Sequence, residues 1–488
     1  MSAAILRHPA FVEWPKDPRD RLPLTLWSAD AIAAATGGTA SCDFQVAGVE
    51  MDSRDVVYGD LFVALKGEAM DGHRFLDKAF ENGATAALVD RPVDYPHVLV
   101  ADTTAALEAL GKAARSRTQA RIIGVTGSVG KTGVKEAIFA SLERASRGAA
   151  HRSTRSYNNH VGVPLSLARM GARSRFGVFE MGMNHAGEIE GLTTQVRPHV
   201  AVITTIAPAH IENLGSMEAI ADAKAEIFAG LEPGGTAVIP ADSEYYDQLR
   251  LAATRAGAKV VSFGKARHAD MRLLDAIPSA NGGSLVTCEF DTGRLCYTVA
   301  EPGEHWVANS LAVMAAVRAA GGDMAAAGLA LAEMGGLKGR GARLGIAVPG
   351  GKALMIDESY NANPASMRAT LAQLGATPST RRIAVLGAMK ELGDFAPKFH
   401  AALAENIIAA DIDFAVLVGD EMRALAGELG KPVLNSLGKP LEWEHCNTAD
   451  EAMELLEDFG IVAGDAVLVK GSNSVGLGRL VDRFTRPE

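Results

Sequence analysis

The stretch Gly124-Val-Thr-Gly-Ser-Val-Gly-Lys-Thr132 decides how the rest of this sequence is interpreted. It completes an apolar run typical of a buried strand and leads into a helical pattern that begins at Lys131. A strand, a glycine-rich turn and a helix in this order bind phosphate, because backbone N–H groups surround the anion at the positive end of the helix. Lys131 can reach the outer phosphates of a nucleotide, and the threonine after it can bind Mg²⁺. The strict pattern requires glycine at position 125, so this loop is a variant built on Gly127 and Gly130.

Short apolar runs alternate with helical patterns on both sides of this loop, which predicts an α/β fold with largely parallel sheets. In the last third, Asp357, Gly387, Gly419 and Lys470 each follow an apolar run, and one helix is predicted over residues 399–410. Ligands of open α/β sheets bind beyond the carboxyl ends of the strands. We therefore predict three domains: a small N-terminal α/β domain (1–119), a central P-loop ATPase-like domain with a parallel sheet (120–336), and a C-terminal Rossmann-like, doubly wound domain (337–488).

Composition excludes several functional classes. The net charge of −10 argues against a nucleic-acid partner, which usually meets a basic face. The four cysteines are scattered without metal-ligand spacing, which argues against zinc and fits a reducing compartment. The first 23 residues lack the apolar core of a signal peptide, and no apolar run is long enough for a membrane span. We expect a cytoplasmic protein.

Three further residues have two possible interpretations each. Glu180 ends an apolar run and is either a Mg²⁺ ligand beside the phosphate loop or a solvated glutamate. His210 follows a strand-like run and is either functional or, more commonly for a single histidine, structural. Lys224 lies on an amphipathic helix and is ordinarily a solvated lysine. A buried lysine near a divalent metal could instead react with CO₂ and become a carbamate ligand.

Taken together, the motifs resemble the Mur ligase family over essentially the whole chain. The resemblance rests on 126–132, on Glu180-Met-Gly182, on His210, on the helix with Lys224, and on His305-Trp-Val-Ala-Asn309. Three features are similar to the family member that adds D-alanyl-D-alanine. They are Asp52-Ser-Arg54 with Asp71-Gly-His73, then Asp357-Glu-Ser-Tyr-Asn-Ala-Asn-Pro364, and finally 386–393 with Val469-Lys-Gly-Ser472. Two positions depart from the family pattern, Ala388 in place of Asp and Asn473 in place of Arg.

The resemblance implies an ATP-dependent, ADP-forming acid–amino-acid ligase that acts in peptidoglycan synthesis, and so in cell shape and division. It would join D-alanyl-D-alanine to UDP-N-acetylmuramoyl tripeptide through an acyl phosphate. The tripeptide would end in diaminopimelate or lysine, and the proton of the amine would pass to His210 or to a carboxylate. The implied cofactors are ATP, two Mg²⁺ and a CO₂-derived carbamate on Lys224, and the implied state is a monomer.

The resemblance also implies a role for each matching residue. The catalytic residues would be Lys131, Glu180, His210 and Lys224. ATP would contact Gly127, Ser128, Val129, Gly130, Lys131, Thr132, Asn309, Arg340 and Asp357. The metal ligands would be Thr132 and Glu180 for one Mg²⁺, and His210 and carbamylated Lys224 for the other. The UDP-sugar peptide would lie along Ser53, Arg54, Asp71, His73, Asn158 and Asn159, and D-alanyl-D-alanine at Tyr360, Asn361 and Asn363.

Two alternatives remain open at this stage. One is a related ligase that adds a different amino acid, or glutamate to folate; the 52–54 block and the Tyr-Asn-Ala-Asn-Pro run argue against it. The other is a P-loop switch protein, which would hydrolyse nucleotide slowly and without regard to peptide or amine. A non-catalytic scaffold is disfavoured by the intact Lys131, Thr132 and Glu180.

Overall fold

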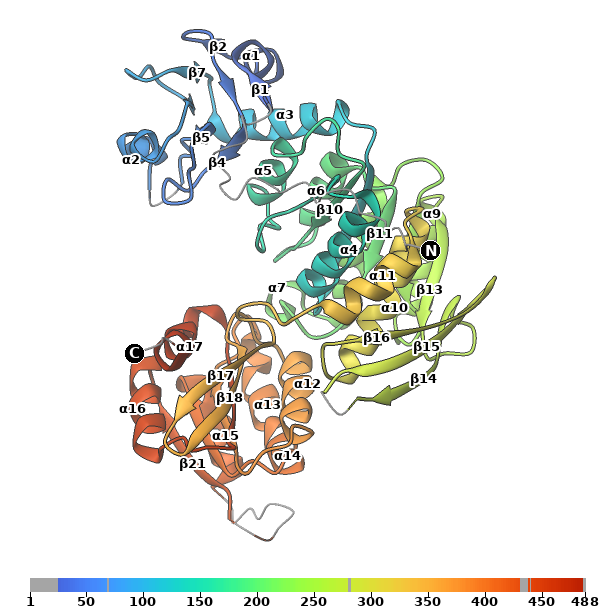
Figure 1. The fold of residues 1–488 in the computed structure, drawn as a ribbon, viewed down its shortest axis with the longest axis vertical. Helices are drawn as coiled ribbons and strands as arrows, with labels where there is room; N and C mark the ends of the chain where they lie inside the picture. Colours follow the sequence, from blue (N-terminus) through green and yellow to red (C-terminus); the bar gives the residue numbers. More distant parts are fainter. Residues whose placement is uncertain (1–24, 68–69, 280–281, 431–437, 439, 486–488) are drawn as a thin grey trace, which may run out of the picture. The chain divides into compact units, whose positions relative to one another are not determined.

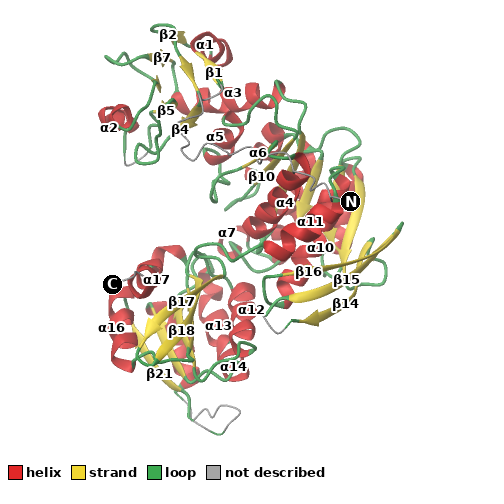
Figure 2. Cartoon of the chain, viewed as in Figure 1, coloured by secondary structure: helices red, strands yellow, loops and turns green. Residues whose placement is uncertain are grey.

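The computed structural model describes residues 25–67, 70–279, 282–430, 438 and 440–485. The first 23 residues, for which no signal peptide is predicted, therefore lie outside the described part. The chain divides into two compact units, Met1–Ala114 and Arg115–Glu488. The strands of three larger sheets alternate with helices along the chain, and the predicted α/β fold class is confirmed (Figures 1 and 2). The predicted domain limits at 119/120 and 336/337 stay predictions.

The first unit contains a five-stranded sheet with one antiparallel edge. Its strands, in spatial order, are β2 (Thr39–Ala40), β7 (His97–Leu99), β6 (Ala86–Val89), β5 (Asp60–Val63) and β4 (Gly48–Glu50). Only β2 runs antiparallel to its neighbour. The remaining elements of this part are β1 (Trp27–Ser28), α1 (Ala29–Thr36), β3 (Gln45–Val46), a 3-10 turn (Gly72–Phe75) with α2 (Leu76–Glu81), and α3 (Thr103–Ser116), which crosses into the second unit. Phe62, Ala87 and Val89 form the centre of its core.

The second unit begins with a nine-stranded sheet that places the phosphate loop at its middle. Its spatial order is β16 (Gly293–Val299), β15 (Ser284–Phe290), β14 (Met271–Pro278), β13 (Lys259–Gly264), β12 (Thr236–Pro240), β11 (Val200–Ile203), β8 (Arg121–Thr126), β10 (Phe176–Glu180) and β9 (Ala150–Arg152). The strands from β9 to β14 are parallel, and β15 and β16 add an antiparallel extension. Because the central strands are buried on both faces, they have continuous apolar sequences.

Helices cover both faces of this sheet. Successive β8 residues contribute to opposite cores: Ile122 packs with one cluster and Ile123 with the other, as the two-residue period of a strand requires. The Ile123 side is covered by α4 (Lys131–Ser146), α10 (Glu304–Ala319) and α11 (Met324–Glu333). The opposite side includes α5 (Gly162–Ala168), α6 (Glu188–Val196), α8 (Met217–Ala225) with the 3-10 turn Glu226–Gly230, and α9 (Tyr246–Arg255). The short helix α7 (Ile211–Leu214) precedes α8.

A six-stranded sheet completes the second unit. Its order is β17 (Ala342–Val348), β18 (Gly351–Glu358), β22 (Ala466–Lys470), β19 (Arg382–Gly387), β20 (Phe414–Val418) and β21 (Glu442–Cys446). All neighbours are parallel except β17 and β18. Its helices are α12 (Pro364–Gly375), α13 (Ala396–Ala401), α14 (Leu403–Ala409), α15 (Arg423–Leu429), α16 (Ala449–Phe459) and α17 (Gly478–Thr485). The helix predicted over 399–410 is wrong as a single element: α13 and α14 meet at Ala402.

No described helix is both long enough and apolar enough to cross a membrane.

Candidate active site

The phosphate loop lies between the end of β8 and the start of α4, and two glycines shape it. Gly127 has φ +143° and Gly130 has φ +86°, both in the region that favours glycine. The loop also packs tightly: a Cβ atom at Gly127 would lie 2.0 Å from the Thr204 hydroxyl, and one at Gly130 would lie 2.9 Å from the Asn309 amide oxygen. Both predicted glycines are therefore required by backbone conformation and by neighbouring side chains.

A Gly127→Ala substitution should destabilise the protein by about 1–3 kcal/mol, the usual cost of a strained backbone at one residue. The added methyl group would also displace the Thr204 hydroxyl, which now donates to the carbonyl of Val129 at 2.5 Å. Thermal unfolding should show a lower Tm and isothermal titration a weaker affinity for ADP. Gly187→Ala is a matched control for backbone strain, because Gly187 has φ +86° but no neighbour within 4 Å of the added atom. Equal ADP affinity in both variants would contradict the prediction.

Lys131 is half-buried over the phosphate loop. Its Nζ donates to the carbonyl of Gly127 at 2.7 Å, so the side chain folds back along the loop it belongs to. Burial lowers the pKa of Lys131, while the nearby Glu180 carboxylate opposes that shift. The ammonium is therefore positioned where an anion bound by the loop would offset its desolvation.

Glu180 lies directly beside the loop because β10 pairs in parallel with β8, placing Glu180 opposite Val125. Its carboxylate is fully buried and accepts from two side chains: the Thr132 hydroxyl at 2.8 Å on Oε2 and the Asn158 amide at 2.8 Å on Oε1. A hydroxyl and a carboxylate next to a phosphate-binding loop are oxygen ligands of the kind Mg²⁺ prefers. The side chain of Asn159 instead accepts from the backbone N–H of Gly162, the first residue of α5, at 2.9 Å.

The second unit contains a cavity of about 680 Å³ next to these residues. It brings together loop residues of the nine-stranded sheet and strand-end residues of the six-stranded sheet, including Lys131, Glu180, Asn309, Arg340, Tyr360 and Asn361. Arg340 donates to the Ser156 hydroxyl at 3.0 Å, and its guanidinium lies 4.2 Å from the centre of the Tyr360 ring. The predicted residues of the two sheets therefore line one space.

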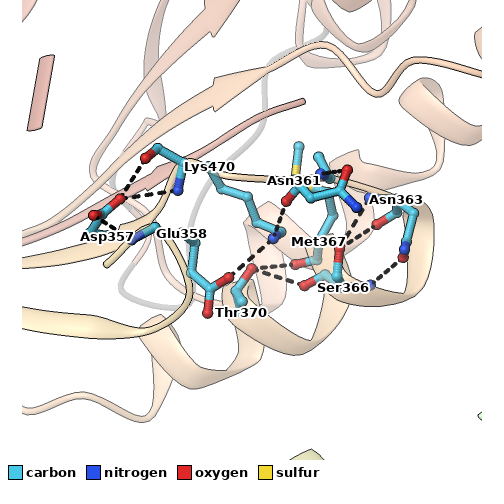
Figure 3. Close-up of polar contacts among 11 residues, drawn as sticks. Asp357, Glu358, Asn361, Asn363, Ser366, Met367, Thr370 and Lys470 are labelled. Atoms are coloured by element: carbon cyan, nitrogen blue, oxygen red, sulfur yellow. Dashed lines mark hydrogen bonds and ion pairs between the residues drawn. The ribbon is translucent and has the colours of Figure 1, made fainter. Parts of the chain in front are cut away.

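Side chains at the ends of β18 and β22 form a connected polar group (Figure 3), and Glu358 and Lys470 of this group line the same cavity. Lys470 is fully buried, and its Nζ donates to the carbonyl of Asn361 at 2.9 Å and lies 3.3 Å from the Glu358 carboxylate. Burial lowers the pKa of Lys470, and Glu358 opposes the shift. Asn363 caps α12 through a reciprocal pair of bonds with Ser366. Hydrogen bonds therefore fix the 360–363 segment at Asn361 and at Asn363.

Asp357 is hydrogen-bonded within the chain at the end of β18. Its buried carboxylate accepts from the backbone of Gly339 at 2.7 Å and from the backbone and hydroxyl of Ser359 at 3.1 and 2.6 Å. These bonds connect the end of β18 to the segment before β17. The neighbouring Glu358 lines the cavity, and the predicted contact of Asp357 with ATP stays a prediction.

His210 and Lys224 differ in their surroundings. His210 lines the cavity and adopts φ +58°, an uncommon conformation for a histidine; its Nδ1 lies 2.5 Å from the Glu391 carboxylate. Glu391 also has a positive φ, +65°, and the contact with His210 lowers the pKa of its carboxyl. Lys224 is fully buried, and its Nζ has no hydrogen-bond partner among the described residues. Burial, reinforced by the charge of Lys131, holds the pKa of Lys224 well below its usual value.

The predicted substrate-binding residues of the first unit bond to neighbouring residues of that unit. Asp71 accepts from Arg91 at 2.8 Å and lies 2.7 Å from Nδ1 of the buried His73, and the Arg91 bond is the main reason for its lowered pKa. Arg54 bonds to Asp52 through its backbone and its guanidinium. Ser53 is buried, and its carbonyl accepts from the side chain of Asn82 at 2.7 Å.

Several residues of the cavity were not assigned a role from the sequence. Glu358 and Lys470 occupy strand ends, a position the sequence pattern shows but cannot distinguish from a solvated charge. Trp306 comes within 2.8 Å of a Cβ atom placed at Gly133, so it packs against the first turn of α4. Burial lowers the pKa of the neighbouring His305 to about 4, so this imidazole is neutral at physiological pH.

A phosphate loop with a buried threonine–carboxylate pair, sharing a cavity with a second, doubly wound sheet, defines the class as a P-loop nucleotide-binding α/β protein. Three family models cover most of the chain in order: "Mur ligase family, catalytic domain" at residues 45–123, "Mur ligase middle domain" at 125–317, and "Mur ligase, glutamate ligase domain" at 343–473. The chain belongs to the Mur ligase family.

Individual relatives agree with this assignment. The UDP-N-acetylmuramoyl-tripeptide–D-alanyl-D-alanine ligase of Escherichia coli K12 is 35% identical over 397 residues, 81% of this chain and 86% of the relative. The ligase of the same name from Bacillus subtilis 168 is 34% identical over 444 residues, 89% of this chain and 92% of the relative. A crystal structure of MurF from Acinetobacter baumannii has a TM-score of 0.80 at 30% identity, covering 95% of this chain and all of that one. The crystal structure of MurF ligase from Thermotoga maritima in complex with ADP has a TM-score of 0.70 at 26% identity, and the match covers 90% of this chain and 97% of that one.

Proposed function

We propose that this chain is an ATP-dependent, ADP-forming ligase that joins D-alanyl-D-alanine to UDP-N-acetylmuramoyl tripeptide and so supplies a cytoplasmic precursor of peptidoglycan. One observation carries the proposal: Glu180, whose carboxylate accepts from the buried Thr132 at the phosphate loop, lines the same cavity as Tyr360, Asn361 and Asn363. A phosphorylated carboxylate and an incoming amine can therefore meet there. The names of the relatives support the choice of substrates.

The contacts around the phosphate loop fit Mg²⁺. Among the described residues, no group of three or more His, Cys, Asp or Glu side chains could hold a metal ion by itself. Mg²⁺ in nucleotide sites is usually held by one or two protein oxygens together with phosphates and water. Thr132 and Glu180 supply two such oxygens, 2.8 Å apart. Bound there with the nucleotide, Mg²⁺ would offset charge on the transferred phosphoryl group.

The surroundings of Lys224 fit a carbamate. The amine of Lys224 is buried without a hydrogen-bond partner among the described residues, and burial lowers its pKa, which favours the neutral form that reacts with CO₂. Its addition to CO₂ releases a proton and replaces an unsatisfied amine with an anionic oxygen ligand. With His210, which lines the cavity, this carbamate is our proposed holder of a second Mg²⁺.

The remaining residues bind and orient the substrates. Lys131 and the loop N–H groups would hold the ATP phosphates, and Asn309 and Arg340 the rest of the nucleotide. Phosphoryl transfer to the terminal carboxylate of the tripeptide turns a poor leaving group into phosphate. Tyr360, Asn361 and Asn363 would hold D-alanyl-D-alanine on the opposite wall, where its amine attacks the acyl phosphate. Ser53, Arg54, Asp71 and His73 of the first unit are our candidates for the UDP-sugar. We propose a monomer as the acting species.

The test is phosphate release from Mg-ATP with UDP-N-acetylmuramoyl tripeptide and one of four additions: D-alanyl-D-alanine, diaminopimelate, D-alanine or nothing. We expect release only with the tripeptide and D-alanyl-D-alanine together, and a product heavier by the dipeptide residue mass. Tripeptides that end in diaminopimelate and in lysine are compared in parallel. Release with another pair of acceptor and amine would keep the ligase class but reject the substrates. Phosphate release that depends on neither the acceptor nor the amine would indicate a nucleotide switch.

A further inference from the structure

A second lysine of α4, Lys135, is fully buried one turn after the phosphate loop. Its Nζ donates to the carbonyls of Ser153 and Arg155, each at 2.9 Å, and pairs with the Glu136 carboxylate at 2.6 Å. Burying an ammonium group is costly unless its hydrogen bonds are made, and here three oxygens surround it. Lys135 therefore joins α4 to the segment that follows β9.

This segment is held in a conformation that it would not readily adopt alone. Arg155 has φ +53°, in the left-handed region that non-glycine residues avoid. A strained residue of this kind persists when its surroundings fix it, and the carbonyl of Arg155 is one of the two that Lys135 binds. The lysine thus stabilises the turn at the point of strain.

The same segment contacts Glu180 at two places. The Ser153 hydroxyl accepts from the backbone N–H of Glu180 at 3.1 Å, and the Asn158 amide donates to its Oε1 at 2.8 Å. The backbone carbonyl of Asn158 also accepts from Gly182 at 2.8 Å. Thr132 fixes the other carboxylate oxygen. Both oxygens of Glu180 are therefore oriented from α4, one directly by Thr132 and one through Lys135 and residues 153–158.

We propose that Lys135 is a positioning residue, which fixes residues 153–158 so that the Glu180 carboxylate is oriented toward a divalent cation at the phosphate loop. This inference rests on the metal role of Glu180 in the proposed function. Partners that orient a ligand typically change metal affinity or activity about 10–100-fold when they are removed. If Lys135 only stabilised the core, its removal would lower the stability of the protein but would not change the Mg²⁺ concentration that ADP binding requires.

The experiment measures ADP binding by the full-length chain at increasing Mg²⁺, using isothermal titration calorimetry. For Lys135→Met we expect an ADP affinity without metal within about twofold of the parent, since the phosphate loop is intact. The Mg²⁺ midpoint, which is the Mg²⁺ concentration that gives half of the metal-dependent gain in ADP affinity, should be about tenfold higher. Glu136→Gln is the matched control: it removes one partner of Lys135 but leaves both carbonyl bonds. Its midpoint should stay within about twofold. A folded Lys135→Met variant with the parental midpoint would overturn the inference.

A Glu180→Gln variant separates this inference from the proposed function. If Glu180→Gln raises the midpoint and Lys135→Met does not, only the role of Lys135 is rejected. If Glu180→Gln leaves the midpoint unchanged, the metal role of Glu180 fails and the inference fails with it. Should Lys135→Met not fold, Lys135→Gln is the second variant: its side-chain nitrogen lies one bond nearer the main chain and cannot bind both carbonyls as Nζ does, so a midpoint raised about tenfold is expected. An unchanged midpoint in folded Lys135→Gln would then reject the proposal.

Discussion

Lys131→Met should lower the rate of phosphate release by about 10²–10³-fold, the usual effect of removing one preorganised donor from developing charge. Lys131 is half-buried over the loop, and its Nζ already lies 2.7 Å from the carbonyl oxygen of Gly127. No other lysine or arginine side chain belongs to the loop itself, residues 124–132. Methionine has a similar length without the charge, so the fold should be retained.

The measurement is single-turnover phosphate release with both substrates present. Lys112→Met is the control for the chemical change alone, because Lys112 is exposed on α3 and pairs only with Glu108 four residues earlier. Its rate should stay within about twofold, since exposed pairs contribute little. A Lys131→Met rate within tenfold of the parent would mean that other groups hold the phosphates.

Lys224→Met should lower the rate by about 10²-fold and yet leave stability equal or higher. The rate falls because the carbamate that would hold the second Mg²⁺ cannot form. Stability does not fall, because methionine replaces a fully buried amine that has no hydrogen-bond partner among the described residues. This opposite response of rate and stability distinguishes a functional lysine from a structural one.

Two measurements accompany the variant. Thermal unfolding gives the stability, and ¹³C NMR of the parent protein under ¹³CO₂ should show a carbamate signal that Lys224→Met lacks. In CO₂-depleted buffer the parent should lose activity and regain it with bicarbonate. A parent enzyme that is indifferent to CO₂ and shows no such signal would remove the carbamate from the mechanism.

Much of the fold could be predicted because its strands are buried on both faces. Continuous apolar runs such as β20 and β22 stand out in the sequence, and all five residues of each are buried. The edge strand β21, Glu-Trp-Glu-His-Cys, alternates exposed and half-buried residues before its buried cysteine and has no continuous apolar run. The break between α13 and α14 lacks a glycine or proline in 399–410, so no local residue marks it.

The site divides along similar lines. Local chain geometry predicted the phosphate loop, because strand, turn and helix are consecutive in the sequence. The ambiguity over Glu180 and Lys224 was a question of burial, which depends on how distant strands pair: the register of β10 against β8 places Glu180 beside Thr132. The sequence does not predict the burial of Lys135 for the same reason. A lysine on a helix is ordinarily solvated, and its two carbonyl partners lie eighteen and twenty residues away in the sequence.

The strand order of the last sheet has a consequence for protein synthesis. β22 is the final strand of the described chain, yet it lies in the interior of the sheet, between β18 and β19. It also ends in Lys470, which binds the carbonyl of Asn361 in the cavity wall. A chain still attached to the ribosome cannot close this sheet until residue 470 has left the exit tunnel. The nascent polypeptide can thus form its phosphate loop before this sheet is complete, and the six-stranded sheet closes only when β22 enters the gap between β18 and β19.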